Sequence, residues 1–282
     1  MRAARVLSAL PDAIFGVAVV LASVTGVGAQ SLPASHGTVD LVAEDSTFES
    51  NRVAWVGLLF NLEKGWHIYW VNPGDAGEPP RIQWDLPTGF QAGGIRWPTP
   101  FRLTTGTLVD YGYEGRTLLP VPLQVPASYQ PGAPVALAAD VRYLVCREVC
   151  IPARTRVTLS LPAATPTPAD VAARHELFRR AQDGSPKPMP STWKVQASES
   201  NGRLVLSLQT GEPEAKAVFF PLERDQIDNA APQIVVPTER DGLRVTLKKS
   251  DLLVQSISVL KGVVVFGANR AFEVVAPVSG RR

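Results

Sequence analysis

The chain has 282 residues, of which 28 are basic and 26 acidic, so its net charge is close to neutral. This balance provides no basic surface for nucleic acid and no polybasic patch for a membrane surface. The sequence also lacks the G-x-S-x-G, H-E-x-x-H, Walker and dinucleotide-binding patterns. Hydrolase, metalloprotease and nucleotide-dependent activities therefore have no support.

The first 29 residues have the features of a secretory signal peptide. Arg2 and Arg5 form a basic start, residues 13–24 form an apolar run, and small residues follow it. Asp12 at the edge of the run leaves an uncleaved anchor as the alternative, although a membrane span needs roughly 20 apolar residues. We therefore expect residues 1–29 to be removed and the mature protein to enter an oxidising compartment, in which disulfides persist.

The mature chain of about 250 residues exceeds the usual size of one domain and predicts two. Residues 30–162 contain short β-branched and aromatic runs separated by turn residues, which predict a β-sandwich or barrel. Residues 163–190 are rich in Pro and Ala and include a short helix candidate, ADVAARHELFRRAQ, so we expect a linker. Strand-like runs resume in residues 191–282. The expected fold class is all-β, with two β-sandwich domains joined by a Pro-rich linker with a short helix.

Both cysteines, Cys146 and Cys150, lie in the stretch VRYLVCREVCIPART. On one straight strand, Cα atoms four residues apart are separated by about 13 Å, whereas a disulfide tolerates about 4.4 to 6.8 Å. The chain must therefore turn between the cysteines before they can bond. The strand-like flanks predict a β-hairpin with residues 147–149 at its tip.

Three roles of this cysteine pair are open. A structural disulfide is one, although closing so short a loop removes only roughly 2 kcal/mol from the unfolded state, against nearly 5 for a loop of about 100 residues. Thiol-disulfide exchange is the second, because one sulfur at a hairpin tip can be exposed while its neighbour resolves a mixed disulfide. Binding of a soft ion such as Cu(I) is the third, but no histidine is near in sequence.

Four motifs in order resemble the N-terminal periplasmic domain of the thiol:disulfide interchange protein DsbD family, especially the branch shared with the suppressor of copper sensitivity protein ScsB. These motifs are WHIYWVNPGDAGEPP, IRWPTP, VDYGYEG and LVCREVCIP. The phrases AVFFPLERDQI and KGVVVF resemble the second sandwich of that branch. The resemblance implies immunoglobulin-like domains and a periplasmic location.

The resemblance also implies roles for particular residues. Cys146 and Cys150 would be the redox pair, which accepts electrons from a membrane-embedded DsbD-like electron transporter and passes them to periplasmic thioredoxin-like proteins. Asp110, Tyr111 and Tyr113 match the position of the family's cap loop, in which an aromatic side chain covers the disulfide until a partner arrives. Such a cap would keep small thiols from the sulfurs. The exchange requires no cofactor and no metal.

The sequence departs from the family in two respects. The family's cysteines are often more widely spaced than the C-x-x-x-C found here, and the usual membrane helices and C-terminal thioredoxin-like domain are not in this sequence. We therefore expect a separate protein to supply the electrons. Arg147 directly after Cys146 favours a thiolate there, which slightly favours Cys146 as the nucleophile, whereas Glu148 opposes it.

The expected function is thus a relay of reducing equivalents by thiol-disulfide exchange. The alternative is a non-enzymatic immunoglobulin-like binding module with a permanent disulfide, linked to copper tolerance, and a Cu(I) carrier is a third reading. Aromatic residues before the cysteines, Trp66, Tyr69 and Trp70, are expected to fill the sandwich core, with lining of the cysteine site as the functional alternative. His67 is expected to be a packed or surface histidine.

Overall fold

The structure is a computed structural model that describes residues 36–162, 167–239, 241–267 and 270–280. The predicted signal peptide, residues 1–29, lies outside these ranges. Within them, no helix has the length and the apolar character that crossing a membrane requires.

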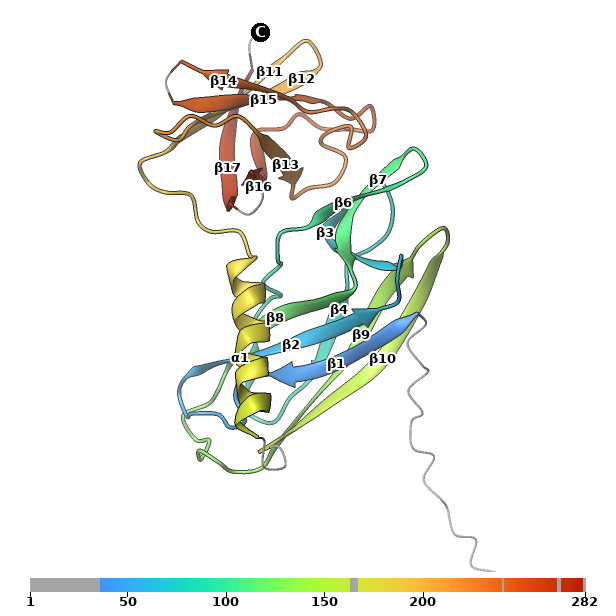
Figure 1. The fold of residues 1–282 in the computed structure, drawn as a ribbon, viewed down its shortest axis with the longest axis vertical. Helices are drawn as coiled ribbons and strands as arrows, with labels where there is room; N and C mark the ends of the chain where they lie inside the picture. Colours follow the sequence, from blue (N-terminus) through green and yellow to red (C-terminus); the bar gives the residue numbers. More distant parts are fainter. Residues whose placement is uncertain (1–35, 163–166, 240, 268–269, 281–282) are drawn as a thin grey trace, which may run out of the picture. The chain divides into compact units, whose positions relative to one another are not determined.

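The first domain is a sandwich of two β-sheets (Figure 1). One sheet has the spatial order β1 (Gly37–Ala43), β2 (Val53–Leu62), β8 (Arg116–Gln124) and β5 (Gln91–Ala92). The other has the order β10 (Cys150–Leu161), β9 (Val135–Cys146), β3 (His67–Gly74), β7 (Leu108–Glu114) and β6 (Phe101–Thr105), and β4 (Arg81–Asp85) also pairs with β9. The pairings are antiparallel, and the long strands β2, β8 and β9 coincide with apolar runs of the sequence.

Alternation along the strands directs one face of each sheet into a shared core. On β9, alternate residues from 137 to 145 are buried in this core. On β3, Ile68 and Trp70 face the core as well. His67 and Tyr69 therefore lie on the outer face of the same sheet, although they are also buried.

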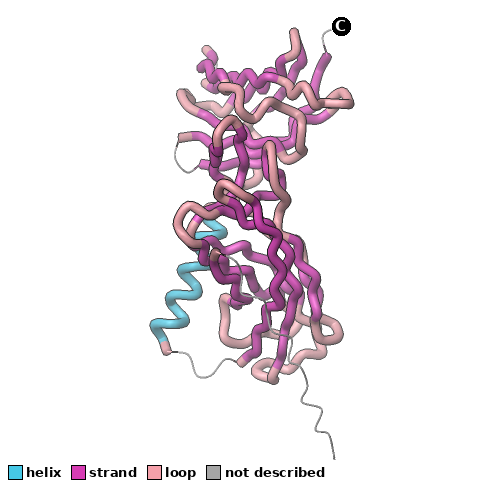
Figure 2. Tube along the Cα trace, turned by 90° about the vertical axis from the view of Figure 1, so that its right-hand side faces the viewer, coloured by secondary structure: helices cyan, strands magenta, loops and turns pink. Residues whose placement is uncertain are grey.

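Helix α1 (Pro168–Asp183) is the helix predicted in the linker, and it packs beside the first domain (Figure 1 and Figure 2). Thr167 and Asp170 form a capping box, in which each side chain accepts a hydrogen bond from the backbone amide of the other. Phe178 is fully buried against Leu118 of β8. This part of the linker therefore covers the outer face of a sheet in addition to joining the domains.

The second domain contains β11 to β17. In spatial order its strands are β13 (Ala217–Pro221), β16 (Val259–Phe266), β17 (Arg270–Gly280), β11 (Lys194–Ser200), β12 (Arg203–Gln209), β15 (Gly242–Lys248) and β14 (Ile234–Thr238). The first part of β17 pairs antiparallel with β16 and its last residues pair parallel with β11, so β17 connects two sheets. Apolar residues such as Leu204, Leu206 and Leu208 fill the core between them. The all-β fold with two immunoglobulin-like domains is thus confirmed.

Candidate redox site

The two cysteines face each other across the β9–β10 hairpin. Cys146 ends β9 and Cys150 begins β10, and these register partners form a disulfide with their Cα atoms 4.2 Å apart. At the tip, the Arg147 amide donates a hydrogen bond to the Val149 carbonyl oxygen, with a nitrogen–oxygen distance of 3.2 Å. The hairpin that the cysteine spacing predicts is confirmed.

Cys146 and Cys150 differ in their exposure to solvent. Cys146 is only 2% exposed, and it lies opposite His67 of the neighbouring strand β3. Cys150 begins the strand at the end of the sheet order and is exposed. Cys150 is therefore the more exposed residue of the pair.

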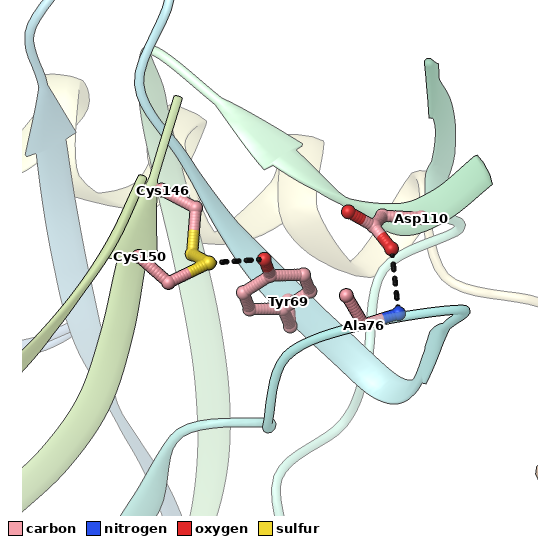
Figure 3. The surroundings of a disulfide bond; sticks show 5 residues. All are labelled: Tyr69, Ala76, Asp110, Cys146 and Cys150. Carbon is pink, nitrogen blue, oxygen red and sulfur yellow. Dashed lines mark hydrogen bonds between the residues drawn. A yellow bond between two sulfur atoms is a disulfide. The ribbon is translucent and has the colours of Figure 1, made fainter. Parts of the chain in front are cut away.

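Tyr69 contacts the disulfide from the outer face of β3 (Figure 3). Its hydroxyl oxygen lies 3.2 Å from Sγ of Cys150, so the hydroxyl can donate a hydrogen bond to the sulfur. Tyr69 is fully buried, and a Cβ added at Gly77, whose φ is +82°, would overlap its ring. Burial, and secondarily the charge of Asp110, raises the pKa of Tyr69. The hydroxyl therefore keeps its proton and remains a donor at neutral pH.

His67 lies beside this contact. It is the register partner of Cys146, and its ring meets the Tyr69 ring edge to face with 5.2 Å between centroids. The side chain is 4% exposed, and its Nε2 has no hydrogen-bond partner among the described residues. Burial lowers the pKa of His67, so its imidazole is neutral at neutral pH.

We expect His67 to make the native state less stable in mild acid. The unfolded chain protonates this histidine near pH of about 6.5, whereas burial in the native state resists the proton. Above that pH the histidine is neutral in both states, and the full stability is present. As the pH falls toward the lowered native pKa, the unfolded chain takes up the proton before the native state does, so the free energy of unfolding decreases. Urea denaturation measures the free energy of unfolding at pH of about 7 and of about 5. Its decrease between these two pH values should be smaller for His67→Phe than for the wild type. Equal differences would contradict a buried neutral imidazole.

Two of the residues predicted to form a cap loop, Tyr111 and Tyr113, lie in β7 and face the core. The Tyr111 hydroxyl donates to Oδ1 of Asn229 over 2.9 Å, and the Tyr113 hydroxyl donates to the Pro98 carbonyl oxygen over 2.6 Å. The aromatic side chain in contact with the sulfur belongs to Tyr69. A covering role for Tyr111 or Tyr113 stays a prediction.

Asp110, the third predicted cap-loop residue, lies on the outer face of β7. Its Oδ1 accepts a hydrogen bond from the Ala76 amide over 2.9 Å (Figure 3). Burial raises the pKa of Asp110, and the Ala76 hydrogen bond opposes this shift. Asp110 therefore fixes Ala76 and the residues beside it, 75–77. We call residues 75–77 the covering segment, because Gly77 lies against the Tyr69 ring.

Arg147, at the tip of the hairpin, packs on an aromatic pair. Its guanidinium carbon lies 5.4 Å from the centroid of the Trp66 ring, which is a cation–π arrangement. Trp66 in turn stacks on His36 with 3.6 Å between ring centroids. The guanidinium next to Cys146 in the sequence therefore packs on Trp66, which restrains the hairpin tip.

The first domain matches a known family. Residues 38–162 match the family model described as thiol:disulfide interchange protein DsbD, N-terminal. No curated protein matches the sequence significantly.

Solved structures show where the fold recurs. The N-terminal periplasmic domain of ScsB from Proteus mirabilis matches with a TM-score of 0.61 and 21% identity, over 88% of this chain and 97% of that chain. The periplasmic chaperone SfaE matches over 86% of this chain and 100% of that chain, with 9% identity and a TM-score of 0.21, which is too low to indicate a shared fold. The ScsB domain thus shares the fold of both sandwiches. Residues 38–162 thus form a domain that is similar to the N-terminal domain of DsbD.

Proposed function

We propose that the Cys146–Cys150 pair relays reducing equivalents in the periplasm, from a membrane-embedded DsbD-like electron transporter to oxidised thioredoxin-like proteins. The observation that carries this proposal is the unequal exposure of two bonded cysteines in a domain of a thiol:disulfide interchange family. An exposed Cys150 can be attacked, while a buried Cys146 can leave and later resolve a mixed disulfide. The apolar run near the N-terminus supports export to the periplasm.

The proposed cycle begins when a donor thiolate attacks Sγ of Cys150. The bond to Cys146 breaks, its electron pair stays on Cys146 as a thiolate, and donor and Cys150 form a mixed disulfide. The donor's second thiolate then attacks the donor sulfur of that bond, which oxidises the donor and releases Cys150. The reduced pair next attacks a target disulfide through Cys150, and Cys146 resolves the second mixed disulfide. Each exchange moves two electrons and two protons without a cofactor.

Tyr69 would assist the step in which Cys150 acts as a thiolate. A hydroxyl that donates to a thiolate stabilises the charged sulfur and lowers the pKa of the thiol. The hydroxyl lies within reach of Cys150 already in the disulfide form. Tyr69 is therefore proposed to stabilise the thiolate of the attacking cysteine.

The redox potential of the mature protein tests the relay. We expect a reversible midpoint between about −270 and about −180 mV, the span from thioredoxin to protein disulfide isomerase, when free thiols are counted by alkylation after equilibration in thiol buffers. A bridge that stays closed well below about −300 mV would overturn the relay. That result would favour the alternative, a binding module with a permanent disulfide and a link to copper tolerance.

A Cu(I) carrier is distinguished by its metal content. The described residues bring together no group of three or more His, Cys, Asp or Glu side chains that could hold a metal ion. The reduced pair offers two thiolates to a soft ion. Retention of copper after purification under reducing conditions, and its loss when both cysteines are changed to Ser, would support this third reading.

A further inference from the structure

The second domain contacts β3 just beyond the redox site. Asn72, which is 1% exposed, donates through Nδ2 to the carbonyl oxygens of Pro221 and Glu223, over 2.8 and 3.1 Å. Its Oδ1 accepts a hydrogen bond from the Gly74 amide over 3.1 Å. This side chain therefore ties the end of β3 to the end of β13.

Asn229 of the second domain makes a second set of contacts with the first. It is 7% exposed, and its Nδ2 donates to Oδ1 of Asp75 over 2.7 Å. Its Oδ1 accepts from the Tyr111 hydroxyl over 2.9 Å, and its carbonyl oxygen accepts from the Arg102 guanidinium over 2.5 Å. Both ends of the amide are thus engaged by the first domain.

Asp75 connects Asn229 to the covering segment. Its Oδ2 accepts from the Val109 amide over 2.7 Å, and its own amide donates to the Val109 carbonyl oxygen over 3.1 Å. The covering segment that starts at Asp75 lies on the Tyr69 ring, and the Tyr69 hydroxyl contacts Cys150. A continuous series of contacts therefore leads from Asn229 to the exposed cysteine.

Apolar side chains also pack between the second domain and the first. Phe220 of β13 is buried within the core cluster of the first domain. Its ring meets Tyr111 and Trp70 edge to face, with 5.2 and 6.3 Å between centroids. Trp70 directly follows Tyr69, so the second domain fixes the strand that carries this tyrosine.

We propose that Asn229 is a positioning residue of the redox site, which holds Asp75 so that the covering segment keeps the Tyr69 hydroxyl on Cys150. The inference rests on the proposed exchange function and deepens it. It gives the second domain, which contains no cysteine, a role in controlling how readily the disulfide is attacked.

Asn229→Asp is the variant that should disturb this arrangement most. It keeps an acceptor for Tyr111 but removes the donor to Asp75 and places a second carboxylate beside it. Asp110 lies near this pair as well: burial is the main cause of its raised pKa, and the charge of Asp75 adds to the shift. The covering segment is therefore expected to move away from Tyr69 and open a path to Cys150.

The experiment measures the rate at which dithiothreitol reduces the disulfide of the full mature chain. Asn229→Asp should be reduced about three times faster than the wild type or more. The double variant Asp75→Asn with Asn229→Asp exchanges the amide and the carboxylate between the two positions. It restores a donor and an acceptor and keeps the net charge, so its reduction rate should return to within about twofold of the wild type. In a Tyr69→Phe background, Asn229→Asp should add no further increase, because both changes act on one contact.

Gln233→Glu is the matched control. The Gln233 amide makes two hydrogen bonds of 2.8 Å with the backbone of Phe219, within the second domain. This variant makes the same amide-to-carboxylate change away from Asp75, and its reduction rate should equal that of the wild type. A wild-type rate for Asn229→Asp, or an equal increase in Gln233→Glu, would overturn the inference. The ratio of the reduction rates of Asn229→Asp and the wild type tests the role of Asn229 even if the measured redox potential contradicts the relay.

Discussion

Cys146→Ser is expected to form a mixed disulfide with oxidised glutathione at least about ten times faster than Cys150→Ser. The first variant keeps the exposed Cys150, whose thiolate can receive a hydrogen bond from Tyr69. The second keeps Cys146, which is 2% exposed and lies opposite the buried His67. Intact mass measured at intervals after mixing gives both rates from the appearance of the glutathione adduct.

The same two variants should behave alike once they are unfolded. In concentrated urea both thiols are equally accessible, so the two adduct rates should converge, and a variant without either cysteine should give no adduct. Faster reaction of Cys150→Ser in the native state would contradict the assignment from exposure. That outcome would support the sequence-based preference for Cys146, in which the charge of Arg147 activates the neighbouring thiol.

Local features of the first domain could be predicted from the sequence because they depend on short-range geometry. Period-two alternation defines the strands. The short spacing of Cys146 and Cys150 requires the chain to turn if they bond, and the strand-like flanks make that turn a hairpin. Neither inference needs to know which strands are neighbours. The fold class and the hairpin were therefore accessible from the residues alone.

The surroundings of the disulfide depend on long-range pairing, which the sequence does not state. The pattern in GWHIYW predicts that Tyr69 lies opposite to Ile68 and Trp70, but not that β3 lies beside the end of β9. Only that pairing brings Tyr69 to Cys150. Alternation within β3 was the available signal, and it could have separated Tyr69 from the core aromatics.

No pattern in the sequence predicts the contacts of Asn229. A single Asn in a turn-rich stretch is ordinarily interpreted as a residue that bonds its own backbone. In the structure its amide spans two domains, and its partner Asp75 is 154 positions earlier in the sequence. A side chain of this kind can be recognised only when the packing of both domains is known.

Gly77→Ala is expected to lower the free energy of unfolding by about 2 to 5 kcal/mol. Two effects contribute. The φ of +82° lies in the left-handed region, where a Cβ costs about 1 to 2 kcal/mol, and the added methyl group overlaps the buried Tyr69 ring, which costs about 1 to 3 kcal/mol. Urea denaturation of the oxidised protein measures the sum.

Gly106→Ala separates these two effects. Gly106 also has a left-handed φ, of +62°, but a Cβ there would meet no atom within 4 Å, so only the backbone term applies. Gly77→Ala should therefore be the less stable of the two, and it alone should speed reduction by dithiothreitol, because the methyl group displaces Tyr69 from Cys150. If both variants lost the same stability and kept the wild-type reduction rate, the covering segment would not hold the tyrosine in place. If only stability differed, the ring would be packed against Gly77 without controlling attack on the disulfide.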